Sequence, residues 1–341
     1  MYLGKNLILI LSPPRCGSTM LQRILGSHSE IQTHPEPHVL TPLAFQGYYY
    51  QIEKAAFNHR AAAKAFREFV DFLPSSENDY LDACRSYCSV LYSRAIEGSG
   101  KRYFLDKTPN YANTILPFIE KVLPEAKFIV LTRHPLAILS SGANTFYGGD
   151  YDRFYYNRDV LGSFIPPISR FMRETSVSHI HIRYEDIVTK PECEVKRLLE
   201  FLDLDYEQEC IHFGKKKHIT KTYGDPSIGT YEKPETISLQ KWVLDLVNRR
   251  DRRRLCEHIL RSIPDDDMSM YGYPIETVWA PLNDVNMSGQ SVEVENASLR
   301  DRLTSMKWSI VRIAQFIASF PAVTRIVRKL VRLCDALLKH R

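Results

Sequence analysis

The sequence predicts an α/β fold in which a parallel sheet is flanked by helices. Short apolar runs at 7–11, 127–131 and 179–184 read as strands, and each is followed by a segment with helical spacing. Continuous apolar runs indicate strands that are covered on both faces, and their alternation with helices indicates parallel pairing. With 341 residues, 44% of them hydrophobic, the chain is long enough for one large domain of this kind.

The turn after the first strand has the features of an anion site. Residues 13–19 read Pro-Pro-Arg-Cys-Gly-Ser-Thr, and an amphipathic helix follows. Free N–H groups at the start of a helix attract negative charge. Arg15 adds a positive charge, and Gly17 lets a ligand approach the backbone. Ser18 and Thr19 offer hydroxyl donors, so the turn predicts a phosphorylated ligand.

The later elements repeat the same alternation. Residues 44–100 look helical and rich in aromatic residues, and we expect them to form an insertion within a domain that spans 1–280. A proline is favoured in the first turn of a helix, so a helix should begin near Pro135, after the second strand. Other helices are expected at 115–122, 191–201 and 238–260, with a polar loop at 204–236.

The end of the chain differs in character from the domain. Residues 281–297 read as a linker, and 298–341 form a basic amphipathic helical tail, interrupted at Pro321. Apolar residues recur there at alternating steps of four and three, which favours a coiled coil and therefore a homo-oligomer. The basic residues among them also suit peripheral contact with an anionic membrane. A helix packed on its own domain is the third interpretation.

Charge and cysteine usage exclude several classes of protein. The net charge is +5, but residues 304–341 carry +7, which leaves the rest of the chain near −2. A basic body that binds nucleic acid is therefore not indicated. No apolar run is long enough for a membrane span, and the first strand begins at residue 7, which leaves no room for a signal peptide. Seven scattered cysteines indicate reduced thiols, so we expect a cytoplasmic protein.

Two motifs carry a resemblance to a known family. The first turn lacks the lysine that a Walker A loop places after its glycine, which disfavours an ordinary ATP or GTP hydrolase. Residues 14–19 instead resemble the 5′-phosphosulfate loop of sulfotransferases that use 3′-phosphoadenosine-5′-phosphosulfate (PAPS), and Arg133 with Ser141 resembles their 3′-phosphate site. Over about 7–242, the chain is most similar to the tyrosylprotein sulfotransferases and their bacterial relatives, which implies a P-loop-like fold and PAPS as the donor.

The resemblance implies three catalytic residues. Arg15 corresponds to an arginine that contacts the sulfonate and bridging phosphate, where it would neutralise charge on the leaving group. Glu36, 21 residues later, has the spacing of the family's general base, with His34 and His38 as rivals for that role. Lys107 would stabilise the transferring sulfonate.

The resemblance also implies the donor-binding residues. They comprise the turn, the 3′-phosphate pair, a tyrosine that contacts the nucleotide and two lysines of a late covering loop, namely Arg15, Cys16, Gly17, Ser18, Thr19, Arg133, Ser141, Tyr184, Lys233 and Lys241. The chain departs from the family at Thr145, where a basic residue would stand twelve positions after Arg133. We expect no metal, because the donor is already activated and the protein supplies positioning and charge.

The sequence thus predicts an O-sulfotransferase that transfers a sulfonate group by in-line displacement. Its acceptor is a hydroxyl of a carbohydrate, which is slightly favoured, or of a peptide tyrosine or small phenol, and aromatic residues in 44–100 and 143–170 would wall the acceptor site. The alternatives are a nucleotide kinase-like phosphotransferase and an inactive nucleotide-binding module that serves in assembly.

Overall fold

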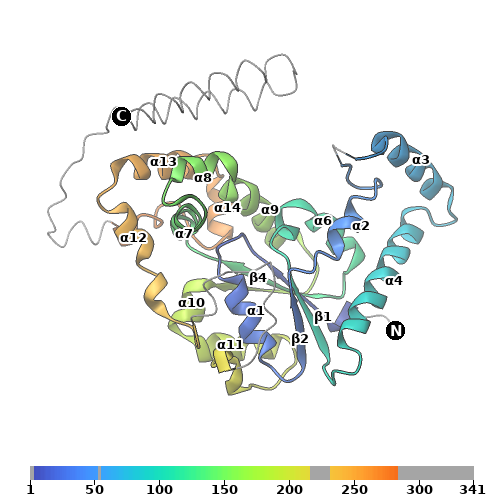
Figure 1. Ribbon diagram of the computed structural model, residues 1–341, viewed down its shortest axis with the longest axis horizontal. Helices are drawn as coiled ribbons and strands as arrows, with labels where there is room; N and C mark the ends of the chain where they lie inside the picture. The colour runs from blue at the N-terminus through green and yellow to red at the C-terminus, as the bar shows by residue number, and fades with distance from the viewer. Residues whose placement is uncertain (1–3, 53–54, 216–230, 283–341) are drawn as a thin grey trace, which may run out of the picture. The chain divides into compact units, whose positions relative to one another are not determined.

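A computed structural model describes residues 4–52, 55–215 and 231–282 (Figure 1). The predicted linker from residue 283 onwards and the helical tail at 298–341 lie outside these residues. The chain divides into two compact units. The first comprises Met1–His134, Ser163–Ile237 and Asp265–Pro274, and the second comprises Pro135–Gly162, Ser238–Pro264 and Ile275–Arg341.

The first unit contains a parallel sheet of five strands, which confirms the predicted fold class. The strands are β1 (Leu7–Leu11), β2 (Ile31–Pro35), β3 (Tyr103–Lys107), β4 (Lys127–Thr132) and β5 (His179–Arg183). Their order in the sheet is β2-β3-β1-β4-β5, and every pairing is parallel. All the carboxyl ends therefore meet at one edge of the sheet, where ligands of such folds bind.

Helices cover both faces of this sheet. On one side lie α1 (Ser18–Gly26), α10 (Tyr184–Thr189) and α11 (Pro191–Phe201), and on the other lie α4 (Glu77–Ile96) and α6 (Leu116–Val122) (Figure 1). After β1 the chain crosses to β2 through α1, and after β3 it crosses in the opposite direction to β4 through α6. Since such crossovers are right-handed, the two helices lie on opposite faces of the sheet. Covering on both faces explains why β1 and β3 are fully buried.

Further helices and 3₁₀ turns complete the first unit. Its other helices are α2 (Leu40–Ala44), α3 (His59–Phe72), α5 (Tyr111–Thr114) and α14 (Asp265–Met270), while α9 (Val160–Glu174) contributes residues to both units. Short 3₁₀ turns lie at Gly4–Asn6, Gln208–Cys210, Phe213–Lys215 and Thr236–Ser238. The predicted helical character of 44–100 is confirmed by α3 and α4. None of the described helices combines the length and the apolar character needed to cross a bilayer.

The expected helix at 238–260 is wrong as a single element. The structure has two helices there, α12 (Lys241–Leu246) and α13 (Arg250–Leu260). The backbone of Arg249 leaves the helical region, with φ −124° and ψ 86°, and Arg249 forms an ion pair with Asp251 at the start of α13. The third predicted strand also ends one residue early, because Tyr184 begins α10.

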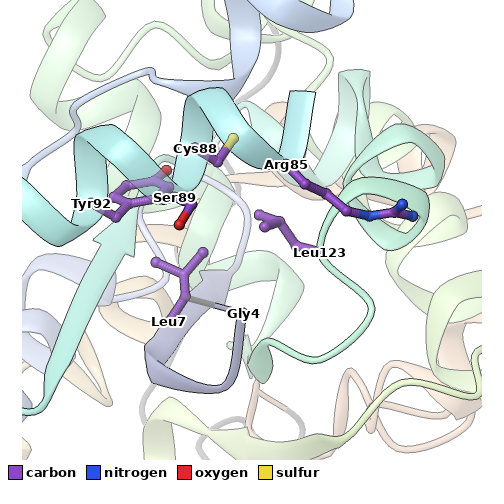
Figure 2. A pocket seen from close by; sticks show the side chains of 7 residues that line it. All are labelled: Gly4, Leu7, Arg85, Cys88, Ser89, Tyr92 and Leu123. Carbon is purple, nitrogen blue, oxygen red and sulfur yellow. The ribbon is translucent and has the colours of Figure 1, made fainter. Parts of the chain in front are cut away.

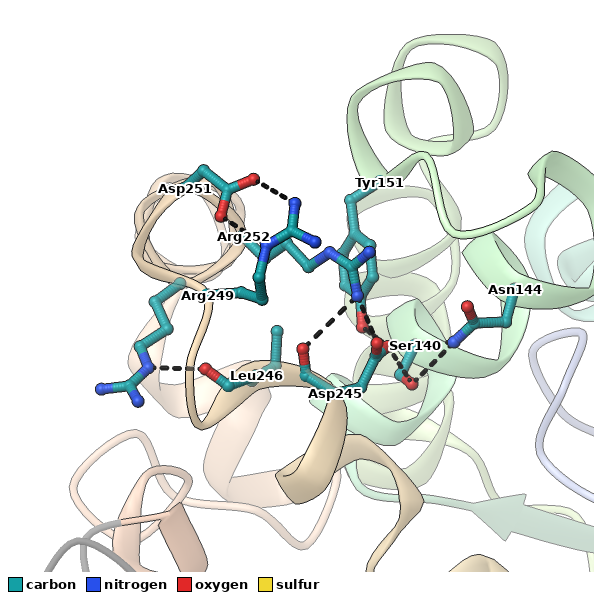
Figure 3. Close-up of polar contacts among 9 residues, drawn as sticks. Ser140, Asn144, Tyr151, Asp245, Leu246, Arg249, Asp251 and Arg252 are labelled. Carbon is teal, nitrogen blue, oxygen red and sulfur yellow. Dashed lines mark hydrogen bonds and ion pairs between the residues drawn. The ribbon is translucent and has the colours of Figure 1, made fainter. Parts of the chain in front are cut away.

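The second unit is held together around one carboxylate. It contains α7 (Pro135–Tyr147), α8 (Tyr151–Asn157), α12 and α13. Asp245 accepts hydrogen bonds from Ser140 Oγ at 2.8 Å, Asn144 Nδ2 at 2.9 Å and Tyr151 Oη at 2.5 Å, and it forms an ion pair with Arg252 (Figure 3). Burial alone would raise the pKa of Asp245, but these hydrogen bonds and the arginine charge hold it below its usual value.

A small cavity lies in the first unit beside α4. Its volume is about 10 Å³, which is room for a single water molecule at most (Figure 2). The lining includes Gly4 and Leu7 at the amino end of β1, together with Arg85, Cys88, Ser89, Tyr92 and Leu123. A space of this size and place is a packing defect rather than a substrate site.

One buried histidine of the sheet makes stability depend on pH. His181 on β5 lies 2.8 Å from Thr132 Oγ1 through its Nε2. Burial, reinforced by the charges of Arg183 and Arg197, lowers its pKa to about 4. The unfolded chain therefore binds a proton more readily than the folded chain. The contribution of His181 to the free energy of unfolding is fully present above about pH 6.5 and is lost as the pH falls towards 4.

We expect the free energy of unfolding to fall by about 1–2 kcal/mol between pH 7 and pH 5 through His181 alone. The measurement is denaturant unfolding at both pH values. In His181→Gln, the free energy of unfolding should fall by about 1–2 kcal/mol less between pH 7 and pH 5 than in the wild type. His179→Gln, on the same strand, is the matched control. A pH dependence that is identical in the wild type and His181→Gln would contradict the assignment.

Candidate functional site

Five chain segments with site residues converge at the carboxyl edge of the sheet. Strand order places the end of β3 between those of β2 and β1, and β4 on the other side of β1. Glu36 follows β2, Lys107 ends β3, the turn with Arg15 follows β1, and Arg133 follows β4. Tyr184 follows β5. The predicted catalytic residues and the first residue of the 3′-phosphate pair are thus delivered by adjacent strands.

The turn after β1 has an unusual backbone. Arg15 has φ 69° and Gly17 has φ 85°, so two residues in the left-handed region flank Cys16. The Cys16 side chain is fully buried, and its Sγ lies 3.6 Å from the hydroxyl of Tyr271. Burial raises the pKa of Cys16 to about 12, which keeps the thiol neutral. Cys16 therefore anchors the turn from below and leaves only its backbone for a donor.

Tyr184 packs underneath this turn. A Cβ atom on Gly17 would lie 2.5 Å from Cδ2 of the Tyr184 ring, so the ring occupies the place that any larger residue would need. The guanidinium of Arg133 stacks over the same ring at 4.3 Å, and its Nη1 donates to the Arg15 carbonyl at 2.9 Å. The tyrosine thus supports the turn and the arginine together, with 7% of its surface exposed.

A buried ion pair joins two of the predicted catalytic residues. Lys107 Nζ lies 2.7 Å from Glu36 Oε1 and 3.4 Å from Thr19 Oγ1, which belongs to α1. The side chain of Lys107 is 1% exposed and that of Glu36 is 18% exposed. The sheet register causes this contact, because Pro35 pairs with Lys107 and Glu36 is the next residue. The structure therefore brings a carboxylate, an ammonium group and the phosphate turn together.

The two histidines near Glu36 have other contacts. His34 Nδ1 lies 3.0 Å from the Pro35 carbonyl, and His38 Nδ1 lies 3.4 Å from Thr41 Oγ1. Both Glu36 and His38 have a positive φ, of 37° and 53°. Such backbone is unfavourable for residues with a side chain, and it persists where the surroundings hold it in place.

Asp106 supplies part of that support. It is fully buried and accepts hydrogen bonds from the hydroxyls of Tyr92 at 2.6 Å, Thr108 at 2.9 Å and Tyr111 at 3.2 Å. Burial raises its pKa in spite of these hydrogen bonds. The Tyr111 hydroxyl also accepts from the backbone N–H of Leu40 at 3.0 Å. Asp106 thereby connects β3 to the segment that follows Glu36, which is a structural role.

Three further residues were predicted to bind the donor. Lys233 is exposed in the first unit. Ser141 lies half-buried on α7, and Lys241 is the exposed first residue of α12, both in the second unit. Their part in binding the donor stays a prediction.

Two of the aromatic residues predicted to wall the acceptor site pack against one another and their neighbours. The rings of Tyr48 and Tyr80 have centroids 4.9 Å apart, and those of Tyr49 and Phe118 are 5.1 Å apart. Glu77 accepts a hydrogen bond from the Tyr49 hydroxyl. Tyr48 and Tyr49 therefore pack against side chains of α4 and α6, and the role of the aromatic residues in an acceptor site stays a prediction.

A group of residues that the sequence did not reveal packs beneath the turns after β1 and β4. Glu185 accepts a hydrogen bond from the backbone N–H of His134 at 3.0 Å and another from the Tyr273 hydroxyl. Arg183 stacks over the Tyr273 ring at 4.6 Å, and Tyr271 contacts Cys16. Tyr271 and Tyr273 lie far along the chain, in a segment without a recognisable motif. Within the described part of the chain, no three His, Cys, Asp or Glu side chains gather as metal ligands.

The close approach of Gly17 to Tyr184 predicts the effect of a methyl group. Gly17→Ala should destabilise the protein by about 2–4 kcal/mol, because strain in the left-handed region adds to a clash with a buried ring. Gly98→Ala is the matched control, since Gly98 has φ +71° but no atom within 4 Å of its Cβ position. It should lose only about 1–2 kcal/mol by denaturant unfolding. Equal losses for the two variants would show that Tyr184 does not limit the turn.

Known proteins resemble this chain in sequence and fold. The model of the sulfotransferase family matches residues 8–208. Nodulation protein NoeE of Sinorhizobium fredii is 27% identical over 70% of this chain and 62% of its own length. Protein-tyrosine sulfotransferase 1 of Danio rerio is 23% identical over 70% of this chain and 65% of its own length. The chain therefore spans less than two thirds of either relative.

Two solved structures share the fold. The sulfotransferase domain from the curacin biosynthetic pathway is 25% identical, with a TM-score of 0.50, and the match covers 75% of this chain and 98% of that domain. The sulfotransferase domain of the Synechococcus PCC 7002 olefin synthase is 21% identical, with a TM-score of 0.51, over 78% of this chain and 92% of that domain. With the family model matching more than half of its length, the chain belongs to the sulfotransferase family.

Proposed function

We propose that this protein transfers the sulfonate group of PAPS to a hydroxyl of an acceptor. The observation that carries the proposal is the contact between Glu36 and Lys107, 2.7 Å apart, beside the phosphate-binding turn. Sulfonate transfer needs three groups: a carboxylate that accepts a proton, a cation that stabilises an anion and a set of backbone donors. They lie together at the edge where sheets of this type bind ligands.

The reaction is an in-line displacement at sulfur. The acceptor oxygen forms a bond to sulfur while the bond from sulfur to the 5′-phosphate oxygen breaks. Glu36 accepts the proton of the acceptor hydroxyl, and the electron pair of the broken bond stays on the leaving phosphate. Arg15 and the N–H groups of the turn neutralise that charge. Lys107 has three N–H donors, so it can bind sulfonate oxygens while it contacts its present partners, Glu36 and Thr19.

The donor is held at two ends. The turn at 13–19 binds the 5′-phosphosulfate, and Arg133 with Ser141 binds the 3′-phosphate, which an arginine recognises well through paired hydrogen bonds. Lys233 and Lys241 add charge to the phosphates. Positive side chains at both ends make a divalent metal unnecessary for holding this donor.

The acceptor is a hydroxyl compound, with a carbohydrate favoured over a peptide tyrosine or a small phenol. The similarities support a hydroxyl acceptor without separating these classes, since one relative is a nodulation protein and another a protein-tyrosine sulfotransferase. A transfer assay with labelled PAPS against glycans, tyrosine peptides and phenols separates them. The same assay with labelled ATP, with and without EDTA, tests the kinase-like alternative, whose phosphoryl transfer depends on Mg²⁺.

The six described cysteines are all free thiols, which supports the expected cytoplasmic location. The expected contacts of 298–341 with a second copy or a membrane surface concern residues outside the described part of the chain.

The base assignment predicts a selective loss of turnover. Glu36→Gln should lower kcat by about 10²- to 10⁴-fold, because the amide cannot accept the proton. Affinity for 3′-phosphoadenosine-5′-phosphate (PAP), measured by calorimetry, should change little, since Glu36 faces the acceptor in this mechanism. Glu30→Gln, at the opposite end of β2, is the control and should keep full activity. Full turnover by Glu36→Gln would transfer the role to His34 or His38.

The 3′-phosphate assignment predicts a loss of donor binding. Arg133→Ala should weaken PAP binding by about 10²-fold, because a charge-assisted, paired contact with phosphate is lost. Binding of adenosine 5′-monophosphate, which has no 3′-phosphate, should be affected much less. Arg197→Ala, on α11, controls for loss of a positive charge. Unchanged affinity of Arg133→Ala for PAP would contradict the assignment.

A further inference from the structure

The segment that carries Glu36 has a restricted backbone. Residues 34–38 read His-Pro-Glu-Pro-His, so a proline stands on each side of Glu36. A proline ring fixes φ of its own residue and restricts the residue before it. Glu36 and His38 have φ of 37° and 53°, which places both in the left-handed region. Few other conformations are therefore open to this segment once its two ends are fixed.

The near end of the segment is held by β3. Pro35 pairs with Lys107 in the sheet, and Lys107 Nζ lies 2.7 Å from Glu36 Oε1. This ion pair fixes one carboxylate oxygen, but the backbone beyond Glu36 is not part of the sheet. The course of residues 37–40 therefore depends on a second attachment.

The far end is held by a tyrosine. The backbone N–H of Leu40, the first residue of α2, donates to the Tyr111 hydroxyl at 3.0 Å. That hydroxyl donates in turn to Asp106 Oδ2 at 3.2 Å, and all three residues are buried. The rings of Tyr111 and His38 also lie edge to face, with centroids 6.4 Å apart and planes at 82°. Tyr111 thus contacts the segment at two points, the backbone of Leu40 and the ring of His38.

The two attachments start from opposite faces of β3. Asp106 and Lys107 are consecutive, and side chains alternate between the two faces along a strand. Lys107 lies 3.4 Å from Thr19 of α1, which covers one face. Asp106 accepts a hydrogen bond from Tyr92 of α4, which covers the other. The end of one strand therefore holds the segment from both sides of the sheet.

We propose that Tyr111 is a positioning residue for the base: its hydroxyl fixes the far end of residues 36–40, so that the Glu36 carboxylate stays beside Lys107 in the orientation that proton transfer requires. The inference rests on the proposed function, in which Glu36 accepts the proton of the acceptor hydroxyl. Such a transfer needs the base at hydrogen-bond distance, and a small displacement lowers the rate. Tyr111 acts through the backbone of Leu40 and not through contact with the substrates.

The test is a double-mutant cycle with the base. The full chain is assayed with labelled PAPS and the acceptor that the wild type sulfonates fastest among the glycans, tyrosine peptides and phenols. Tyr111→Phe should lower kcat by about tenfold, because the Leu40 N–H loses its acceptor and the segment shifts. In a Glu36→Gln background, the same change should lower kcat by less than about twofold, since the group that Tyr111 positions is already absent. Affinity for PAP, measured by calorimetry, should change little in either background.

Tyr92→Phe is the matched control. Tyr92 is also deeply buried, and its hydroxyl donates to the same oxygen, Asp106 Oδ2, at 2.6 Å. The variant removes one hydrogen bond of Asp106 but leaves the contact between Tyr111 and Leu40 in place. It should lower the unfolding temperature, as Tyr111→Phe does, while kcat stays within about twofold of the wild-type value.

A second variant keeps the proposal testable if Tyr111→Phe does not fold. Pro37 is only half-buried, and Pro37→Gly frees the backbone of the segment without a change in the core. It should lower kcat by about two- to fivefold, and this loss should also disappear in the Glu36→Gln background. Thermal unfolding of all variants shows which are folded.

The outcomes separate this inference from the proposed function. Full turnover by Glu36→Gln would show that the proposed base is wrong, and the inference would fail with it. If Glu36→Gln is impaired but folded Tyr111→Phe, or Pro37→Gly in its place, keeps full turnover, the positioning role is overturned while the proposed function stands. An equal fall in kcat with and without Glu36 would also overturn that role, since it is the effect of a general structural defect.

Discussion

Lys107 has a full positive charge on a side chain that is 1% exposed, and the site depends on how that charge is compensated. Removing one partner of a buried ion pair costs about 3–5 kcal/mol, because the other charge is left without solvent or a counter-ion. Glu36 is that partner, at 2.7 Å. The ion pair holds the ends of β2 and β3 together, and it holds Glu36 in a left-handed conformation that a residue with a side chain otherwise avoids. An arrangement of this cost is typical of a site selected for function rather than for stability.

The parallel sheet turns these local contacts into one site. Because the strands run in the same direction, every turn at their carboxyl ends opens on the same edge. The central strand, β1, carries the phosphate-binding turn, with the ion pair on one side and Arg133 on the other. Tyr184 and Tyr271 fill the space beneath: the ring of Tyr184 excludes any side chain at position 17, and the hydroxyl of Tyr271 contacts Cys16 in the turn after β1. Contacts with these buried aromatic residues restrict the backbone of the turn after β1.

The sequence was enough to predict the parts of the site where a motif of suitable residues directly follows a recognisable strand. The turn around Arg15 follows a strongly apolar strand and precedes an amphipathic helix, so its location was predictable. The strands β2 and β3 were harder to recognise, since β2 is an edge strand of mixed polarity and β3 ends in two buried charged residues. Tyr271 was beyond prediction, because its contact with Cys16 depends on the tertiary fold and spans 255 residues. The break between α12 and α13 was missed because no proline or glycine marks Arg249, where the backbone leaves the helical region.

The ion pair also bears on which residue acts as the base. Accepting a proton adds one positive charge whether the base is a carboxylate or a histidine, so repulsion by the ammonium of Lys107 does not by itself choose between them. Position supports Glu36 as the proposed base, since its Oε1 lies 2.7 Å from Lys107 Nζ, whereas His34 contacts the Pro35 carbonyl and His38 contacts Thr41. In the proposed mechanism Lys107 binds the sulfonate oxygens through the N–H group that it does not use for Glu36 or Thr19. In that mechanism the ion pair places the proposed base next to the group that stabilises the sulfonate, so deprotonation of the acceptor and attack on sulfur take place at one point of the sheet edge.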